Sequence, residues 1–171
     1  MGGSQGAEIF GNIVPEVIKM IKDAGYEIKI NQQCTAGQKN LIIDFYEKNN
    51  IKNYVFEFDK NILKFALSSN LAITRCGSST IAELNHTLTP FIAVPLLNSI
   101  DNHQYLNAKY YENKGCCWLL EQSNFNTENL FNLIMEIIKN KNKLKYINEN
   151  MKKIYNKNVY SDIENEIKEF I

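Results

Sequence analysis

Residues 71–83, with the sequence LAITRCGSSTIAE, decide the fold. The run Leu71-Ala72-Ile73 is short and apolar, as is typical of a buried parallel strand. A glycine and three hydroxyl residues follow, and the segment to about His86 has the apolar spacing of a helix. We therefore predict a strand, a tight turn and the start of a helix in immediate succession.

This turn suits an anion. The backbone N–H groups of Ser78, Ser79 and Thr80 would have no acceptor inside the new helix, whose N-terminus carries roughly half a positive charge. Arg75 adds a full positive charge. Glu83 lies one helical turn beyond Ser79, where its carboxylate can accept two hydrogen bonds from a ribose diol. A phosphate site beside a diol site indicates that the ligand is a nucleotide. The alternative is that the hydroxyl residues only cap the helix and that Glu83 is a solvated surface residue.

Strands and helices alternate on both sides of this stretch. Such alternation predicts an α/β fold, a Rossmann-like parallel sheet with helices on both faces. We expect one domain over residues 1–171, with the C-terminal helices of about 127–171 packing on it. Expected strands are 26–31, 54–58, 71–73, 91–94 and 117–120, and expected helices are 8–24, 39–49, 59–69 (capped by Asp59), 78–86 and 101–113.

Ligands of open α/β sheets bind beyond the carboxyl ends of the strands. Four polar or glycine-rich loops are expected at that edge, at residues 2–6, 58–60, 76–80 and 96–104. Their coincidence strengthens the nucleotide hypothesis beyond what any single loop supports.

The N-terminal segment MGGSQGA, residues 1–7, is expected to be a loop, and Pro15 should bend or divide the helix that follows. Such loops normally follow a buried strand, yet no strand precedes this one. That strand would be central in the sheet, so its absence should leave two open edges and a hydrophobic slot. We expect poor stability unless a partner or a dimer fills the slot.

Composition narrows the function classes. Hydrophobic residues make up 44% of the chain and the formal net charge is zero, which gives no electrostatic argument for nucleic acid as a partner. Four cysteines without a CxxC pair and two histidines predict free thiols and no metal site. No apolar run approaches the ~18 residues of a membrane span, and we see no signal peptide or cofactor motif.

The chain resembles the C-terminal half of the MurG family of GT-B glycosyltransferases, over essentially all 171 residues. The resemblance is carried, in order, by GGSQGA at 2–7, a strand that ends in Glu57-Phe58, RCGSSTIAE at 75–83, Val94-Pro95, and DNHQ at 101–104 with Asn107-Ala108. Each piece is weak alone, but the order and spacing are specific.

The resemblance implies UDP-N-acetylglucosamine contacts. The backbone at Asp59 would pair with uracil, the amides of 78–80 would hold the diphosphate, Glu83 the ribose, and Gln104 the sugar hydroxyls. The full set of implied donor-binding residues is Ser4, Asp59, Arg75, Ser78, Ser79, Thr80, Ile81, Ala82, Glu83 and Gln104.

Alternatives remain open for two of these residues. Gln104 with Asp101 fits a capping box at the start of its own helix. Ser4 fits a simple turn residue. Asn107 is expected to cap or brace the loop, and His103 receives no catalytic role.

The implied reaction transfers N-acetylglucosamine from UDP-N-acetylglucosamine to lipid I, with inversion, in peptidoglycan synthesis. The resemblance places the acceptor site, the general base and the membrane-docking surface on an N-terminal half that is absent here. We therefore expect no turnover by this chain alone, whether it is a domain fragment, a split-gene product or a truncated frame.

The implied location is the cytoplasm, or the cytoplasmic face of the bacterial inner membrane as a peripheral protein. The alternatives for function are a non-catalytic UDP-sugar-binding subunit of a split transferase, or another GT-B enzyme such as a UDP-sugar epimerase.

Overall fold

The computed structural model describes residues 3–97, 99–155 and 168. Its strands form two parallel sheets. In the first sheet β1 (Lys29–Gln33) pairs with β2 (Lys52–Phe56), with Lys29 opposite Lys52. The second sheet has the order β3 (Ala72–Thr74), β4 (Phe91–Ala93), β5 (Cys117–Leu119). The predicted α/β class with parallel strands is confirmed, and the sheet divides between β1 and β3.

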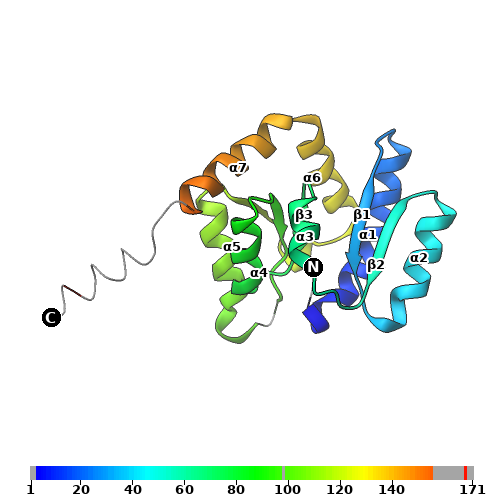
Figure 1. Ribbon diagram of the computed structural model, residues 1–171, viewed down its shortest axis with the longest axis horizontal. Coiled ribbons are helices and arrows are strands. Elements are labelled where there is room, and N and C mark those ends of the chain that lie inside the picture. Colours follow the sequence, from blue (N-terminus) through cyan, green and yellow to red (C-terminus); the bar gives the residue numbers. More distant parts are fainter. Residues whose placement is uncertain (1–2, 98, 156–167, 169–171) are drawn as a thin grey trace.

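Helices cover both sheets (Figure 1). The seven α-helices of the described residues are α1 (Gly3–Asp23), α2 (Lys39–Lys48), α3 (Ile62–Leu67), α4 (Ser78–His86), α5 (His103–Asn113), α6 (Thr127–Lys139) and α7 (Lys141–Tyr155). Single 3₁₀ turns occur at 36–38, 100–102 and 122–124. Among the described helices, none has the length and apolar character needed to cross a membrane.

The expected N-terminal loop was wrong, because residues 3–7 belong to α1. Pro15 lies inside this helix and does not divide it. One missing N–H is tolerated because the apolar face of α1 is buried: Val14, Val17 and Ile21 are each at most 4% exposed. Packing therefore outweighs the local effect of the proline.

Two apolar clusters hold the elements together. The first cluster joins α1 with the inner faces of α2 and α6 and includes Phe10, Ile42 and Leu130. The second joins α4, α5 and α7 around β4 and includes Leu84 and Met151. The α6–α7 pair contributes to both clusters, so the C-terminal helices pack across the two sheets.

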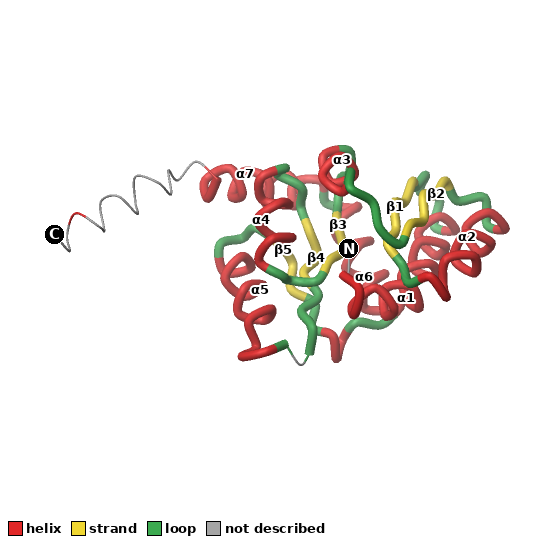
Figure 2. Tube along the Cα trace, turned by 60° about the horizontal axis from the view of Figure 1, so that its bottom comes forward, coloured by secondary structure: helices red, strands yellow, loops and turns green. Residues whose placement is uncertain are grey.

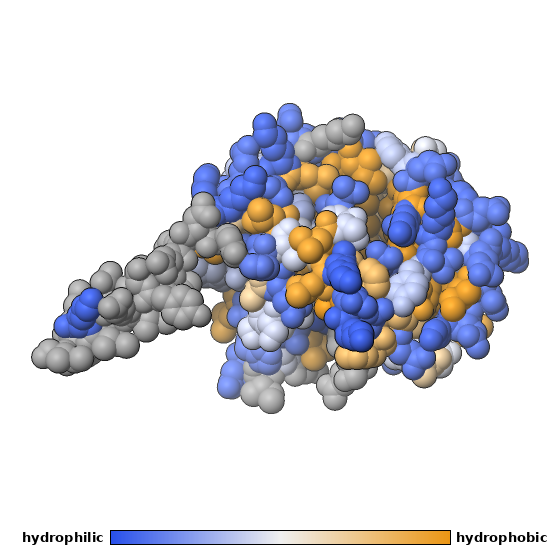
Figure 3. Space-filling view, viewed as in Figure 1, coloured by the Kyte–Doolittle hydropathy of each residue, from blue (hydrophilic) through white to orange (hydrophobic). Residues whose placement is uncertain are grey.

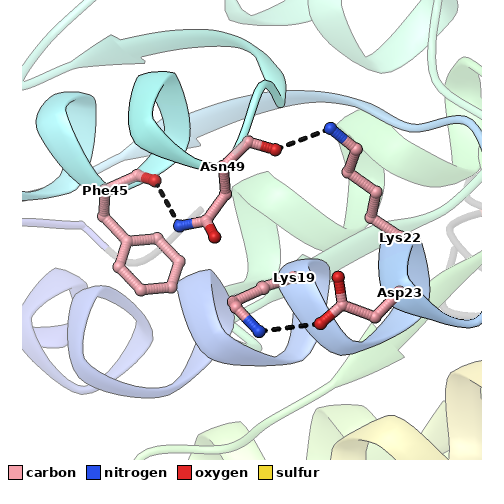
Figure 4. A network of polar contacts seen from close by, with 5 residues as sticks. All are labelled: Lys19, Lys22, Asp23, Phe45 and Asn49. Carbon is pink, nitrogen blue, oxygen red and sulfur yellow. Dashed lines mark hydrogen bonds and ion pairs between the residues drawn. The ribbon is translucent and has the colours of Figure 1, made fainter.

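The far ends of α1 and α2 are joined by polar contacts (Figure 4). Lys22 Nζ donates to the carbonyl oxygens of Asn49 and Asn50, both at 2.6 Å. A lysine beside the last carbonyls of a helix compensates its negative end. These contacts position α2 and thereby β1, which lies between the two helices in sequence.

Candidate functional site

The candidate site lies along one edge of the molecule. In Figure 1, β1 and β3 run from top to bottom, and their carboxyl ends, the start of α1 and the β4–α5 loop all lie along the lower edge. The four predicted loop regions therefore share this edge, although residues 3–7 reach it as the first turns of a helix.

The start of α4 presents free amides. Gly77 is extended (φ −63°, ψ 141°), and the first helical bond is donated by Ile81 N to Gly77 O at 3.1 Å. The N–H groups of Ser78, Ser79 and Thr80 thus have no acceptor within their own helix, and the N-cap residue, Gly77, has no side chain to cap them. Ser78 and Ser79 are exposed, so this end of the helix is open to an anion from solvent.

Arg75 is a buried cation and not an exposed one. Its side chain is only 7% exposed, and its Nη1 donates to the carbonyl oxygens of Val94 and Pro95, both at 3.2 Å. The guanidinium also lies over the Phe10 ring, 5.3 Å from its centroid. Arg75 therefore joins the ends of β3 and β4 to α1, and burial lowers its pKa.

Gln104 and Asn107 from α5 clamp the turn before α4. Gln104 Oε1 accepts from the backbone N–H of Cys76 at 3.2 Å and of Leu96 at 3.1 Å. Asn107 Nδ2 donates to the carbonyl of Cys76 at 3.1 Å. The peptide groups on both sides of Cys76 are thus fixed by one helix. Gln104 keeps its Nε2 amide as a donor for a ligand.

The capping box at the start of α5 is absent. Asp101 and Asn102 both adopt the left-handed conformation (φ 48° and 56°), and the N-cap side chain makes no capping bond. Ser99 Oγ instead accepts from the backbone N–H of Gln104 at 3.3 Å. The Gln104 side chain is consequently available for the Cys76 turn. Two adjacent left-handed non-glycine residues mark this loop as strained.

The remaining predicted residues of α4 differ in accessibility. Glu83 is half-buried and lies one turn below Ser79, as the spacing predicts. Ala82 is exposed, whereas the Ile81 side chain is 1% exposed and belongs to the second apolar cluster. The side chain of Ile81 is therefore part of the core, and its N–H is already used by Gly77.

Asp59 lies after β2, on the other sheet. Its carboxylate accepts from the backbone N–H of Asn61 at 2.7 Å and from the Tyr54 hydroxyl at 2.9 Å, and these bonds, the first being the stronger cause, lower its pKa. The predicted helix 59–69 is shorter than expected, at Ile62–Leu67, because Asp59 closes a turn before it and does not cap its first residue.

Two positions complete the description of the edge. Ser4 lies in the first turn of α1, and the start of this helix lies at the same edge (Figure 1). Phe58 is 84% exposed and was not singled out by sequence reasoning as a contact. Its signal was an aromatic residue at the end of the alternating run 54–58, where a base could stack. The sequence predicts that Asn107 caps or braces the loop, but it does not identify the Cys76 carbonyl as its partner.

The four cysteines are free thiols, as predicted, and the structure shows that all four are buried. Burial raises the pKa of Cys76 to about 12, with Arg75 acting in the opposite direction. A neutral thiol of this kind is unreactive, so Cys76 contributes its backbone and its volume to the site but no nucleophile.

Known proteins resemble the chain over most of its length. The model of the glycosyltransferase family 28 C-terminal domain matches residues 1–167. The UDP-N-acetylglucosamine–N-acetylmuramyl-(pentapeptide) pyrophosphoryl-undecaprenol N-acetylglucosamine transferases of Pelagibacter ubique and Rickettsia prowazekii are 38% and 40% identical over 95% and 88% of the chain. The chain spans 46% and 40% of the length of these relatives.

A solved structure gives the same result. The crystal structure of Acinetobacter baumannii MurG matches 90% of the chain and 44% of its own length, with a TM-score of 0.75 and 25% identity. The glycosyltransferase of kitacinnamycin shares the fold over 80% of the chain and 34% of its own length, with a TM-score of 0.55 and 15% identity.

Proposed function

The chain belongs to the family of the glycosyltransferase family 28 C-terminal domain, and from this we propose that it is the donor-binding part of an inverting N-acetylglucosamine transferase of peptidoglycan synthesis. The donor is UDP-N-acetylglucosamine and the acceptor is lipid I, at the cytoplasmic face of the membrane. The names of the curated relatives support the class of donor and acceptor. Residues 1–171 act as one donor domain.

The observation that carries the proposal is the open N-terminus of α4 with its clamped turn. The amides of residues 78–80 would hold the diphosphate, and Arg75, Gln104 and Asn107 keep the turn in place. When the sugar leaves, negative charge grows on the UDP diphosphate. Amides that are already oriented stabilise this charge without reorganisation.

The other donor contacts follow from position. Glu83 accepts from the ribose hydroxyls, the backbone at Asp59 pairs with uracil, Ser4 lies near the diphosphate, and Gln104 Nε2 donates to a sugar hydroxyl. Ile81 and Ala82 contribute only as neighbours of the bound nucleotide in α4. No residue of this chain is assigned as the general base, so turnover requires an acceptor domain or partner chain that supplies one.

The ribose contact gives a sharp test. Wild-type chain and Glu83→Gln are titrated with UDP-N-acetylglucosamine and with its 2′-deoxy-ribose analogue. Wild type should bind the deoxy analogue about 10-fold or more weakly, because a hydrogen bond to a charged acceptor is lost. Glu83→Gln should bind both donors with similar, weaker affinity.

If wild type and Glu83→Gln discriminate equally between UDP-N-acetylglucosamine and its deoxy analogue, Glu83 does not contact the ribose. Failure of a folded wild-type chain to bind either donor would overturn the proposed function. Circular dichroism of both proteins establishes that they are folded.

A further inference from the structure

One carboxylate closes the loop between β2 and α3. Asp59 Oδ1 accepts from the backbone N–H of Asn61 at 2.7 Å, and Asp59 Oδ2 accepts from the Tyr54 hydroxyl at 2.9 Å. The first bond leads forward to the N-cap residue of α3, and the second leads back to β2. Residues 57–61 are thereby tied to both of the elements that they connect.

Aromatic neighbours hold the ring of Tyr54 in place. Its centroid lies 5.6 Å from that of Phe56 and 5.3 Å from that of Phe65, and the rings of Phe56 and Phe65 are also 5.3 Å apart. Tyr54 and Phe56 share one face of β2, because they are two residues apart in a strand, and α3 contacts this face through Phe65. Figure 2 shows α3 on one side of β1 and β3, with α1 and α6 on the other. Packing between β2 and α3 therefore fixes the position of the Tyr54 hydroxyl.

The loop has little other support. Helix α3 has only six residues, and Leu63 and Leu67 are exposed on its surface. Figure 3 shows apolar residues next to polar ones over this part of the molecule. The backbone N–H groups of residues 58–60 have no acceptor among the described residues. The bond from Tyr54 to Asp59 is therefore the contact that holds the middle of the loop to the strand.

Both partners of this bond are in the protonation state that it requires. The backbone N–H of Asn61 and then the Tyr54 hydroxyl lower the pKa of Asp59, so its side chain is a carboxylate at neutral pH. The hydrogen bond to Asp59 raises the pKa of Tyr54, so the phenol keeps its proton. A charged acceptor makes this hydrogen bond stronger than one between two neutral groups.

We infer that Tyr54 is a positioning residue for base recognition, because its hydroxyl holds Asp59 and thereby fixes the direction of the free backbone N–H of Asp59. The inference rests on the proposed function, in which this backbone pairs with uracil. An N–H in a fixed direction can donate to the keto oxygen at C4 of uracil. Cytosine carries an amino group at that position, which is itself a donor and leaves the N–H without an acceptor. Tyr54 should therefore set the preference for uracil over cytosine.

The test measures the binding of UDP and CDP to the full chain by calorimetry. Wild type should bind UDP about tenfold or more tightly than CDP, since cytosine leaves a donor unpaired. Tyr54→Phe keeps the ring among its aromatic neighbours and removes only the hydroxyl. This variant should lower the ratio of the two affinities to about threefold or less, because the N–H is no longer held in one direction. Tyr110→Phe, at an exposed tyrosine of α5, is the matched control and should keep the wild-type ratio.

A double-mutant cycle tests whether the hydroxyl acts through Asp59. Asp59→Ala removes the acceptor and should also lower the ratio. Adding Tyr54→Phe to Asp59→Ala should not lower the ratio further, because the two residues form one interaction. A further decrease in the double variant would show that Tyr54 acts by another route and would overturn the inference.

Nuclear magnetic resonance measures the loop without any nucleotide. The amide order parameters of residues 58–60 should be about 0.85 in wild type and should fall below about 0.6 in Tyr54→Phe. Equal order parameters in the two proteins would show that the hydroxyl does not fix the loop, and this result would overturn the inference whether or not a nucleotide binds.

Two binding results would overturn the inference and leave the proposed function intact. One is an unchanged ratio of UDP to CDP affinity in Tyr54→Phe. The other is a loss of affinity for UDP and CDP by the same factor, since a merely structural contact would weaken both nucleotides equally. If a folded wild-type chain binds neither nucleotide, the proposed function itself fails, and base recognition by this loop fails with it.

Discussion

Gln104 has a structural contact in the fold and a separate role in our proposal. Its Oε1 accepts from two backbone N–H groups of different loops, and we propose that its Nε2 donates to the sugar of the bound nucleotide. The motif around Gln104 suggested a local cap, since a sequence pattern reveals only neighbours in the chain. Its actual partners, Cys76 and Leu96, lie 28 and 8 residues away, a contact that the spacing of residues could not predict.

Two substitutions of Gln104 separate these roles. Gln104→Met should lower the free energy of unfolding by about 1–3 kcal/mol, because it leaves partly buried N–H groups without an acceptor. Gln104→Glu keeps an acceptor oxygen and should remain close to wild type in stability, yet bind UDP-N-acetylglucosamine about tenfold more weakly, since it loses the donor and adds negative charge. Urea unfolding and calorimetry measure the two effects. Equal donor affinity of Gln104→Glu and wild type would remove Gln104 from the sugar site.

The buried thiol of Cys76 predicts an alkaline pH dependence. Its pKa is raised from 9.0 to about 12 by burial. The folded chain therefore holds this proton more tightly than the unfolded chain, and the associated stability is complete below pH 9 and lost as pH rises toward 12. Between these values the unfolding free energy of wild type should fall more steeply than that of Cys76→Ala, by up to about 1.4 kcal/mol per pH unit. If the unfolding free energies of wild type and Cys76→Ala fall in parallel between pH 9 and pH 12, the raised pKa of Cys76 is contradicted.

At the scale of elements, the first turn of α4 is the proposed anion site. Proline is tolerated at the first residue of a helix, where the N–H has no helical acceptor in any case. Ser78→Pro should therefore leave the helix intact and remove one diphosphate donor. We expect about 10-fold or greater weakening of UDP binding, since a bond to a charged group is lost.

Thr127→Pro is the matched control for Ser78→Pro. It replaces the first residue of α6, where the preceding Asn126 is extended, as Gly77 is before α4, and where the Asn126 side chain caps Asn129. This variant should bind UDP like wild type. Unchanged UDP affinity in Ser78→Pro, with its helix content retained, would show that the α4 amides do not hold the diphosphate.

Element types were predictable because apolar periodicity reflects burial, but the strand bounds were not. The alternation at 26–31 correctly identified partly buried Tyr26, Ile28 and Ile30. The strand itself runs from Lys29 to Gln33, because pairing with β2 sets its limits. Gln32 is buried there, as it accepts from the Tyr46 hydroxyl, and hydropathy assigns such a residue to a loop.

At the scale of the whole molecule, the parallel α/β arrangement followed from the order of the elements alone, because strand–helix alternation allows few topologies. The division into two sheets matches the expected pair of open edges and the apolar slot between them. The clustering of the site loops was predictable from topology. The buried role of Arg75 was not, since only the three-dimensional path of β4 brings Val94 O and Pro95 O to it.

Our central proposal is that a UDP-sugar binds at the carboxyl edge of these strands. Calorimetric titration of the full chain with UDP-N-acetylglucosamine, UDP-glucose and ADP-ribose tests it most directly. We predict saturable one-to-one binding of UDP-N-acetylglucosamine, with ADP-ribose at least about tenfold weaker, a difference of about 1.4 kcal/mol. Binding of ADP-ribose with equal affinity, or no heat of binding from a chain shown to be folded, would contradict the account.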